Sequence, residues 1–189
     1  MADDMLSEVL GETERKMAKA VEVLRHDLAT IRTGRASPAL VDRLHVAYYG
    51  SEMPLNQVAG ITTPEPRLLL IQPWDKSAIS AIEKAILKSE LGLTPSNDGN
   101  VIRIVLPQLT EERRRNLVKV VHRRVEDGRV AVRNVRREAH DDLREMRKEN
   151  MLTEDDLKQA EVRLQRLTDR FIAEDDRVGQ QKEAEVMEV

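Results

Sequence analysis

The chain has no cysteine and very few aromatic residues. Its 189 residues contain no Cys, and Phe, Trp and Tyr together make up 2%. Without cysteine the chain cannot form disulfides, cysteine-ligated zinc sites, iron–sulfur clusters or a thiol nucleophile. Because β-sandwiches and barrels use aromatic residues in their cores, so low a content argues against both. A charged share of 34% beside 40% hydrophobic residues favours long helices with aliphatic seams.

Long apolar runs are missing as well. No run approaches the roughly 18 residues that a membrane span needs, and the first four residues, Met-Ala-Asp-Asp, are acidic. We therefore expect neither a membrane span nor a signal peptide. The expected protein is cytoplasmic and monomeric, with no membrane partner.

Proline is absent from both ends of the chain. All seven prolines lie between Pro38 and Pro107. Because proline costs about 3 kcal/mol inside a helix, this distribution predicts two long helical flanks around a module of another kind. The predicted organisation is a discontinuous helical domain of residues 1–33 and 107–189, with an inserted domain at 34–106.

Apolar periodicity supports this division. Aliphatic residues recur every three or four positions in three stretches, which predicts helices at about 5–31, 111–148 and from 154 onward. Thr153 and Asp156 resemble a capping box after a short turn at 149–152. Between the flanks, short apolar runs predict strands at 44–49, 67–72 and 101–106, a helix at 75–89, and a turn at 94–100. The fold class is α+β, a three-helix bundle with an inserted small domain.

A strongly basic stretch lies within the second predicted helix. Residues 113–137 carry ten basic and two acidic side chains, and nine of the ten are arginines. Arg129, Arg133 and Arg136 fall on one helical face, and the planar guanidinium both pairs with phosphate and stacks on bases, as RNA binding requires. A solvated face partly neutralised by the acidic third helix explains the same pattern. The pattern alone leaves both interpretations open.

No pattern of an enzyme site is present in the sequence. The four histidines are scattered, and HExxH, GxGxxG, phosphate-loop and GxSxG patterns are absent. His122 and His140 are expected on a solvated helix surface. The acidic run at 174–176 is also expected to be solvated, since consecutive helical residues point in different directions. We expect no catalytic residues, no metal and no cofactor.

Several short segments, read together, match one known family. The main ones are residues 31–38 (IRTGRASP), 107–114 (PQLTEERR) and 129–137 (RVAVRNVRR). Residues 46–50, 91–95 and 182–185 match as well. In this order and over the whole chain, the set resembles the ribosome recycling factor family.

The resemblance implies a fold and a function. Its members have a three-helix bundle and an inserted α/β domain joined by two hinge strands into an L similar in outline to transfer RNA. They bind the ribosome after termination and, with elongation factor G and its GTP hydrolysis, split it into subunits, releasing mRNA and tRNA. The factor itself is not an enzyme. The hinge would fall on two segments: Thr33, Gly34, Arg35, Ala36 and Ser37, and Leu106, Pro107 and Gln108.

The same resemblance implies contacts to ribosomal RNA of the large subunit. These would fall on Arg133 and Arg136, with Arg129 and Arg137 as neighbours. Arg136 lies about 39 Å along the helix from Thr110, which predicts a position near the tip of the bundle. Arg32 and Arg35 form a second basic group at the hinge end. For Arg32, a favourable charge at a helix C-terminus is an equally good explanation.

Two other functions are considered for a chain of this composition. A helical adaptor or coiled-coil partner would bind protein through an aliphatic seam, and its binding would be much less sensitive to salt than phosphate contacts. An RNA-remodelling enzyme is disfavoured by the missing nucleotide loop.

Two glycines, Gly128 and Gly179, fall inside the second and third predicted helices. Each costs about 1 kcal/mol inside a helix, so whether these helices are straight stays open.

Overall fold

The structure is a computed structural model that describes residues 2–188. The chain divides into two compact units. A large unit combines the residues up to Arg32 with Glu111–Glu188, and a small unit comprises Thr33–Thr110. Within the described range, no helix is long and apolar enough to cross a membrane.

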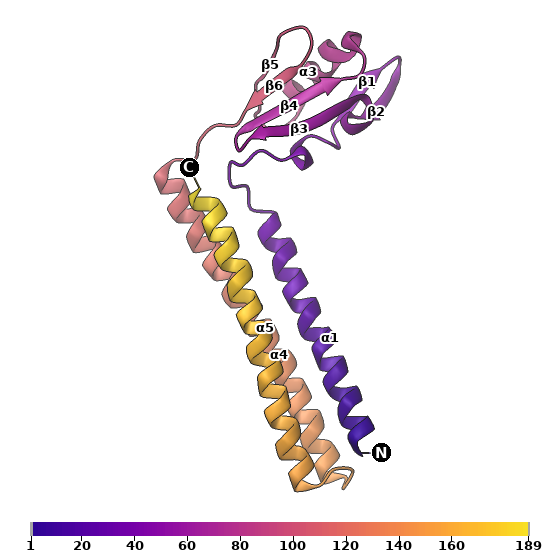
Figure 1. The fold of residues 1–189 in the computed structure, drawn as a ribbon, viewed down its shortest axis with the longest axis vertical. Helices are drawn as coiled ribbons and strands as arrows, with labels where there is room; N and C mark the ends of the chain where they lie inside the picture. The colour runs from indigo at the N-terminus through magenta and orange to yellow at the C-terminus, as the bar shows by residue number, and fades with distance from the viewer. Residues whose placement is uncertain (1, 189) are drawn as a thin grey trace. The chain divides into compact units, whose positions relative to one another are not determined.

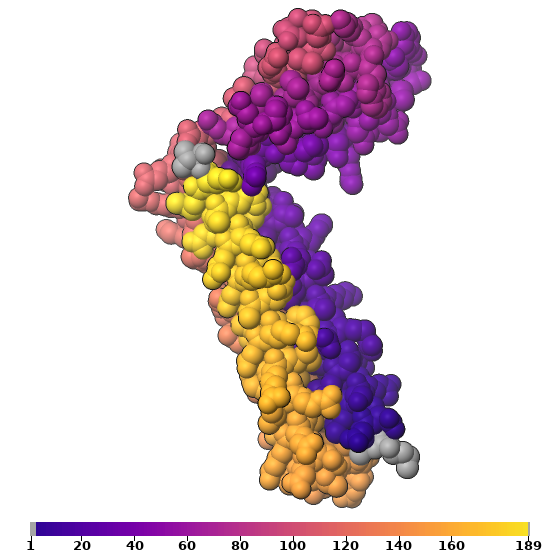
Figure 2. Space-filling view, viewed as in Figure 1, coloured from indigo at the N-terminus to yellow at the C-terminus, as the bar shows by residue number. Residues whose placement is uncertain are grey.

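The large unit is a bundle of three long helices, as predicted. They are α1 (Ala2–Ala29), α4 (Glu111–Lys148) and α5 (Glu154–Met187). Each helix packs against the other two, and the space-filling view shows α5, in yellow and orange, against the indigo α1 (Figure 2). Their apolar faces meet in an aliphatic core that includes Met17, Val132, Leu143 and Leu164, all nearly inaccessible to solvent. Burial of these faces, rather than intrinsic propensity, holds such helices together.

The turn between α4 and α5 is fixed by the predicted capping box, which the structure confirms. The Thr153 hydroxyl accepts from the Asp156 N–H at 3.1 Å, and the Asp156 carboxylate accepts from the Thr153 N–H at 2.9 Å. The Thr153 hydroxyl also donates to the Asp156 carboxylate at 2.6 Å, and this hydrogen bond, followed by that from the Thr153 N–H, lowers the pKa of Asp156. Asn150 adopts a left-handed conformation, with φ 59°, that ends α4. Helix α5 therefore turns back along α4.

The two glycines inside helices are points of close helix approach. A Cβ atom on Gly179 would lie 2.5 Å from Cγ2 of Val125, and one on Gly128 would lie 3.0 Å from Cδ2 of Leu24. Both α4 and α5 continue through these positions without interruption. The glycines therefore serve packing and do not break the helices.

The acidic run in α5 is not a solvated surface, so that prediction is wrong. Asp175 is completely buried, and one carboxylate oxygen lies 3.3 Å from the Cβ position of Gly128. Neither of its carboxylate oxygens has a hydrogen-bond partner among residues 2–188. Burial raises the pKa of Asp175 to about 6, and the charge of Asp176 acts in the same direction. Consecutive residues do point in different directions, and one of these directions is the core.

The small unit combines a four-stranded antiparallel sheet with a helix and a hairpin (Figure 1). The sheet has the order β3-β4-β6-β5, and β1 pairs with β2 in a separate hairpin. Ile71, Ile82 and Ile102 belong to its core. The elements, in chain order, are η1 (Pro38–Leu40), β1 (His45–Tyr48), β2 (Ser51–Pro54), α2 (Leu55–Val58), β3 (Ala59–Glu65), β4 (Leu68–Pro73), η2 (Lys76–Ala78), α3 (Ile79–Lys88), β5 (Pro95–Asn97) and β6 (Ile102–Val105).

The predicted strands correspond to β1, β4 and β6, but three strands were not predicted. Strand β5 lies inside 94–100, where turn residues led us to predict a turn throughout, so that prediction is wrong in part. Pro95 is tolerated because β5 is an edge strand, paired only with β6. Strands β2 and β3 carry mostly exposed or half-buried side chains, so no apolar run marks them.

Candidate nucleic-acid interface

The arginines of α4 flank its buried stripe. Leu117, Val121, Val125, Val132, Ala139 and Leu143 form that stripe. Arg133, Arg136 and Arg137 are exposed, while Arg129 is half-buried. Arg136 lies 25 residues after Glu111 in a helix of 38 residues, about 38 Å from its start and about 18 Å from its end. The site therefore lies about two-thirds of the way along α4. The sequence had predicted a position near the tip of the bundle, which lies farther along this helix.

Ion pairs of arginine and close histidine–carboxylate contacts between α4 and α5 line the seam on this side of the bundle. Because the helices are antiparallel, basic groups along α4 meet acidic groups in reverse order along α5. We call this set the α4–α5 ladder. Its members are His122–Glu183 at 3.0 Å, Arg129–Asp176 at 2.7 Å, His140–Glu161 at 3.1 Å and Arg147–Glu154 at 3.5 Å.

The ladder has a gap opposite the predicted RNA contacts. Between its Arg129 and His140 pairs, Arg133 pairs with Glu126 of its own helix, at 3.2 Å, and with no other side chain in the described part of the chain. Across the seam, the Gln165 amide donates to Asp169 at 2.8 Å, so these two α5 side chains bond to each other. The gap leaves a stretch of α4 where positive charge exceeds nearby negative charge.

Arg136 and Arg137 are the least neutralised of the predicted arginines on α4. Among residues 2–188, neither side chain makes a hydrogen bond or an ion pair. Their guanidinium groups carry all five N–H donors into solvent, in a geometry that fits phosphate oxygens. An exposed arginine without a partner gives up little on binding an anion, because no ion pair must first be broken.

Arg129 is held in a different way. Its Nε donates to Asp176 at 2.7 Å, and its Nη1 donates to Glu126 at 2.9 Å. These hydrogen bonds, first that to Glu126 and then that to Asp176, raise the pKa of Arg129. In turn, hydrogen bonds from Arg129 and then Arg133 lower the pKa of Glu126. Arg129 therefore clamps α4 to α5, and its prediction as an RNA contact remains a prediction.

Arg32 and Arg35 are not brought to this part of α4. Both are exposed, and α1 ends at Ala29, three residues before Arg32. The Arg124 guanidinium donates to the Asp27 carbonyl at 3.4 Å, which places this end of α1 level with the first half of α4. Arg32 belongs to the large unit and Arg35 to the small one.

Several predicted hinge residues are bound into the small unit. The Ala36 N–H donates to the Pro66 carbonyl at 2.7 Å, and the Leu106 N–H donates to the Arg67 carbonyl at 2.8 Å. Ser37 caps η1 by accepting from the Ala39 N–H at 3.3 Å. Pro107 and Gln108 are exposed.

Gly34 lies where the first and last segments of the small unit approach each other closely. Its φ is 76°, in the left-handed region that favours glycine, and a Cβ there would lie 3.2 Å from Cγ of Leu109. Thr33 and Arg35 on either side both have interaction partners. Gly34 and Leu109, both of the small unit, therefore meet at a position where only glycine fits without strain.

Sequence reasoning missed how the side chains of α4 pair with their acidic partners. Glu126, Asp176 and Glu183 each bind an arginine or histidine side chain of α4, yet Glu126 and Glu183 were not singled out and Asp176 was expected to be solvated. The signal was present in the opposite charges of α4 and α5, but the register between the helices was needed to read it. Groups of three or more residues that could hold a metal ion are absent from residues 2–188.

The fold and the arginine surface define a class of protein: an α+β protein with a discontinuous three-helix unit, an inserted sheet unit and a basic face on its central helix. A family model described as "Ribosome recycling factor" matches residues 24–187. The chain belongs to the ribosome recycling factor family, which confirms the resemblance seen in the sequence.

Individual relatives match over nearly the whole chain. Identity is 58% over 185 residues to the ribosome-recycling factor of Roseiflexus sp. (strain RS-1), which covers 98% of this chain and 100% of that protein. It is 57%, with the same coverage, to that of Halalkalibacterium halodurans. A solution structure of the ribosome recycling factor matches with TM-score 0.71 and 48% identity over 97% of this chain and 98% of the other.

A second solved structure belongs to an assembly. It is described as models for the T. thermophilus ribosome recycling factor and the E. coli elongation factor G bound to the E. coli post-termination complex. The matching chain has TM-score 0.62 and 52% identity, over 97% of this chain and 99% of that one.

Proposed function

We propose that this protein binds the post-termination ribosome and, together with elongation factor G and GTP, promotes its dissociation into subunits, releasing mRNA and tRNA. Membership of the ribosome recycling factor family supports this proposal. So does the similar chain whose assembly is described with elongation factor G on a post-termination complex. In this proposal the protein acts by binding, and GTP hydrolysis belongs to its partner.

The gap in the α4–α5 ladder is the observation that carries the RNA-binding part. Arg136 and Arg137 would pair with phosphates of ribosomal RNA in the large subunit, and Arg133 would join them after exchanging Glu126 for phosphate. Arg129 would contribute by fixing α4 against α5, so that the free arginines keep their positions. Arg32 and Arg35 would form a separate, weaker group.

The hinge is proposed to lie next to the segments that are hydrogen-bonded within the small unit. Because Ala36, Ser37 and Leu106 form such hydrogen bonds, a rotation between units would be absorbed mainly by the backbone angles of Gly34, Pro107 and Gln108. Such hinges are a few terminal residues whose backbone angles change.

The first test of the function is sedimentation of post-termination ribosomes with this protein, elongation factor G and GTP, omitting each in turn. Free subunits are expected only when all three are present. Binding to the large subunit that weakens steeply with salt supports phosphate contacts. A binding affinity that does not change with salt concentration favours the helical adaptor instead, and the absence of binding refutes the proposal.

The second test isolates Arg136. Arg136→Ala is expected to keep its stability within about 0.5 kcal/mol, because the side chain is exposed and unpaired. Loss of one charge-assisted hydrogen bond should weaken ribosome binding roughly 10-fold or more and reduce the salt slope by about one. Arg166→Ala is the matched control, since Arg166 is an exposed arginine of α5 that also lacks a partner among residues 2–188. Equal binding by the two variants would show that the assignment is wrong.

A further inference from the structure

Three of the four aromatic residues of the chain lie in the small unit, and two of them are exposed. Tyr49 has an exposed fraction of 81% and Trp74 of 70%, while Tyr48 is half-buried. A chain with one Trp, two Tyr and one Phe has few large side chains available for its core. Placing two of them in solvent contributes little to folding, and exposed aromatic residues are typical of recognition surfaces.

A single carboxylate fixes the two tyrosines. The hydroxyl of Tyr48 donates to Asp75 at 3.0 Å, and that of Tyr49 donates to the same oxygen at 3.3 Å. The other carboxylate oxygen accepts from the Ser77 N–H at 2.9 Å. The two rings meet edge to face, with centroids 4.5 Å apart. Hydrogen bonds from Ser77 and then from Tyr48 lower the pKa of Asp75, so the carboxylate stays charged at neutral pH.

Trp74 directly precedes this carboxylate and has an anchored backbone. Its N–H donates to the Val58 carbonyl at 3.2 Å. Asp75 in turn caps η2. The exposed Trp74 is therefore attached to rigid structure on both sides. Rigid aromatic side chains bind partners at a low cost in conformational entropy.

Tyr49 occupies a backbone conformation that its own chemistry disfavours. With Gly50 it forms the two-residue turn between β1 and β2, and φ is 47° at Tyr49 and 77° at Gly50. Turns of this kind favour Asn-Gly, and a bulky residue with positive φ is an outlier. Retained strain of this kind occurs where the surrounding structure fixes a residue for function.

The charges around this surface favour a protein cation over RNA. Residues 33–110 carry seven basic and seven acidic side chains, so the small unit has no excess of positive charge to attract phosphate. Lys76 is exposed beside Asp75, and it supplies one positive charge only. Aromatic faces beside a fixed carboxylate attract guanidinium and ammonium groups instead. Exposed Trp and Tyr are also frequent anchors of protein–protein interfaces.

We propose that Tyr48, Tyr49, Trp74 and Asp75 form a docking surface for an arginine or lysine side chain of a protein partner. The cation would stack on the exposed rings while Asp75 balances its charge. This surface belongs to the small unit and uses none of the arginines of α4. It would give the protein a second, RNA-independent contact.

The first experiment uses Trp74, the only tryptophan of the chain, as the reporter. The full protein is titrated with an arginine-containing peptide of about a dozen residues, with the same peptide carrying neutral citrulline for arginine, and with an oligouridine of similar length. Saturable quenching by the arginine peptide, at least roughly fivefold tighter than by the citrulline peptide, is expected. Equal binding of the two peptides, or tighter binding of oligouridine, would overturn the proposal.

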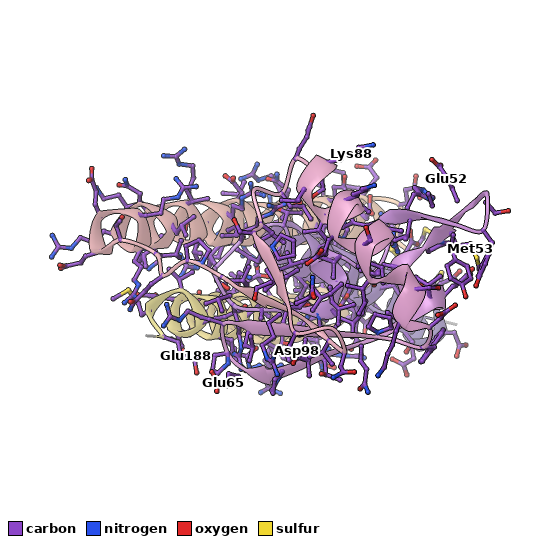
Figure 3. The ribbon with its side chains drawn as sticks, turned by 90° about the horizontal axis from the view of Figure 1, so that it is seen from above. Glu52, Met53, Glu65, Lys88, Asp98 and Glu188 are labelled. Carbon is purple, nitrogen blue, oxygen red and sulfur yellow. The ribbon has the colours of Figure 1, made fainter. Side chains whose placement is uncertain are left out.

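Three variants sharpen the result. Asp75→Asn keeps the cap, because Asn caps as well as Asp, and should weaken peptide binding roughly fivefold. Tyr49→Asn gives the turn its favoured Asn-Gly sequence while removing a ring, so it folds and should also bind more weakly. Glu65→Gln is the matched charge control, since Figure 3 shows Glu65 at the opposite end of the small unit from Glu52 and Met53 of the hairpin. Unchanged binding by Tyr49→Asn would contradict the proposal even if Asp75→Asn failed to fold.

The second experiment rests on the proposed function. A photo-crosslinking p-benzoylphenylalanine replaces Tyr49 in the full chain, which is then bound to post-termination ribosomes with elongation factor G. The expected product is a crosslink to a protein segment containing arginine or lysine. Crosslinks to RNA alone, or sedimentation with ribosomes and no crosslink, would overturn the docking surface and leave the recycling function standing. Failure to sediment with ribosomes would instead count against the recycling function, while the peptide titration still decides the docking surface.

Discussion

Identical substitutions at two helix glycines should have opposite effects on stability. Gly11 lies inside α1, and a Cβ there would have no neighbour within 4 Å. Gly11→Ala should therefore stabilise the protein by about 0.5–1 kcal/mol, the difference in helix propensity. Gly179 lies inside α5, where the same Cβ would lie 2.5 Å from Cγ2 of Val125.

The magnitude at Gly179 follows from this overlap. Carbon atoms in contact prefer about 3.5–4.0 Å, so Val125 would have to move by about 1 Å. Val125 is 5% exposed, and its β-branched side chain has few alternative rotamers. Overpacking of this kind costs about 1–3 kcal/mol, which outweighs the gain in helix propensity. Both variants gain the same helix propensity, so they should differ by the overpacking cost of about 1–3 kcal/mol, with Gly179→Ala the less stable.

Urea unfolding followed by circular dichroism at 222 nm measures both variants, because the three long helices dominate that signal. A further variant tests the cause. Val125→Ala alone leaves a cavity, and adding Gly179→Ala to it should cost little, since the new methyl group then enters that space. If Gly179→Ala proves as stable as Gly11→Ala, the close approach of α4 and α5 at this position is refuted.

Two further predictions concern residues with unusual surroundings. The buried Asp175 binds a proton more readily when folded, because its pKa rises from 3.8 to about 6, so stability should rise as pH falls from 7.5 to 5, by on the order of 1–2 kcal/mol. Asp175→Asn should remove that part of the pH dependence and be more stable than the wild type at pH 7.5. Urea titrations at both pH values measure the free energy of unfolding, and the same change between the two pH values in wild type and variant would contradict a buried carboxylate without hydrogen bonds. Gly34→Ala should cost about 1–2 kcal/mol, because alanine is strained at a φ of 76°. Light scattering of ribosomes should show subunit splitting slowed more than binding, and equal losses would argue against a hinge at Gly34.

The helices were predictable because each carries an uninterrupted apolar stripe. Burial of that stripe is the main stabilising term of the large unit, and it leaves a period of three to four residues that requires no partner to be recognised. The start of α5 was marked by Thr153 and Asp156 of the capping box, whose hydrogen bonds are local in the sequence. Local interactions of this kind join residues that are close in the sequence, so the sequence alone indicates them.

The remaining features depend on distant residues. Strands β2, β3 and β5 are short and largely exposed, so their pairing partners define them better than their own sequences do. The interior position of Asp175 required knowledge of which face of α5 meets Gly128. In the same way, the resemblance named Arg129 and Arg136 together, and only the register of α4 against α5 separates the clamped arginine from the free one.

The split of the large unit across the sequence has a consequence for its biosynthesis. Contacts of α1 reach far along the chain, since Arg25 pairs with Glu174, 149 positions later. At about 5–20 residues per second, α1 waits on the order of ten seconds after synthesis before α4 emerges to cover it. Helices α4 and α5 are joined by a five-residue turn at 149–153 and can pair at once. We expect pulsed hydrogen exchange during refolding to show protection of α4 and α5 before that of α1. The first helix to be synthesised is then the last to dock. Until it docks, its aliphatic face stays accessible to chaperones.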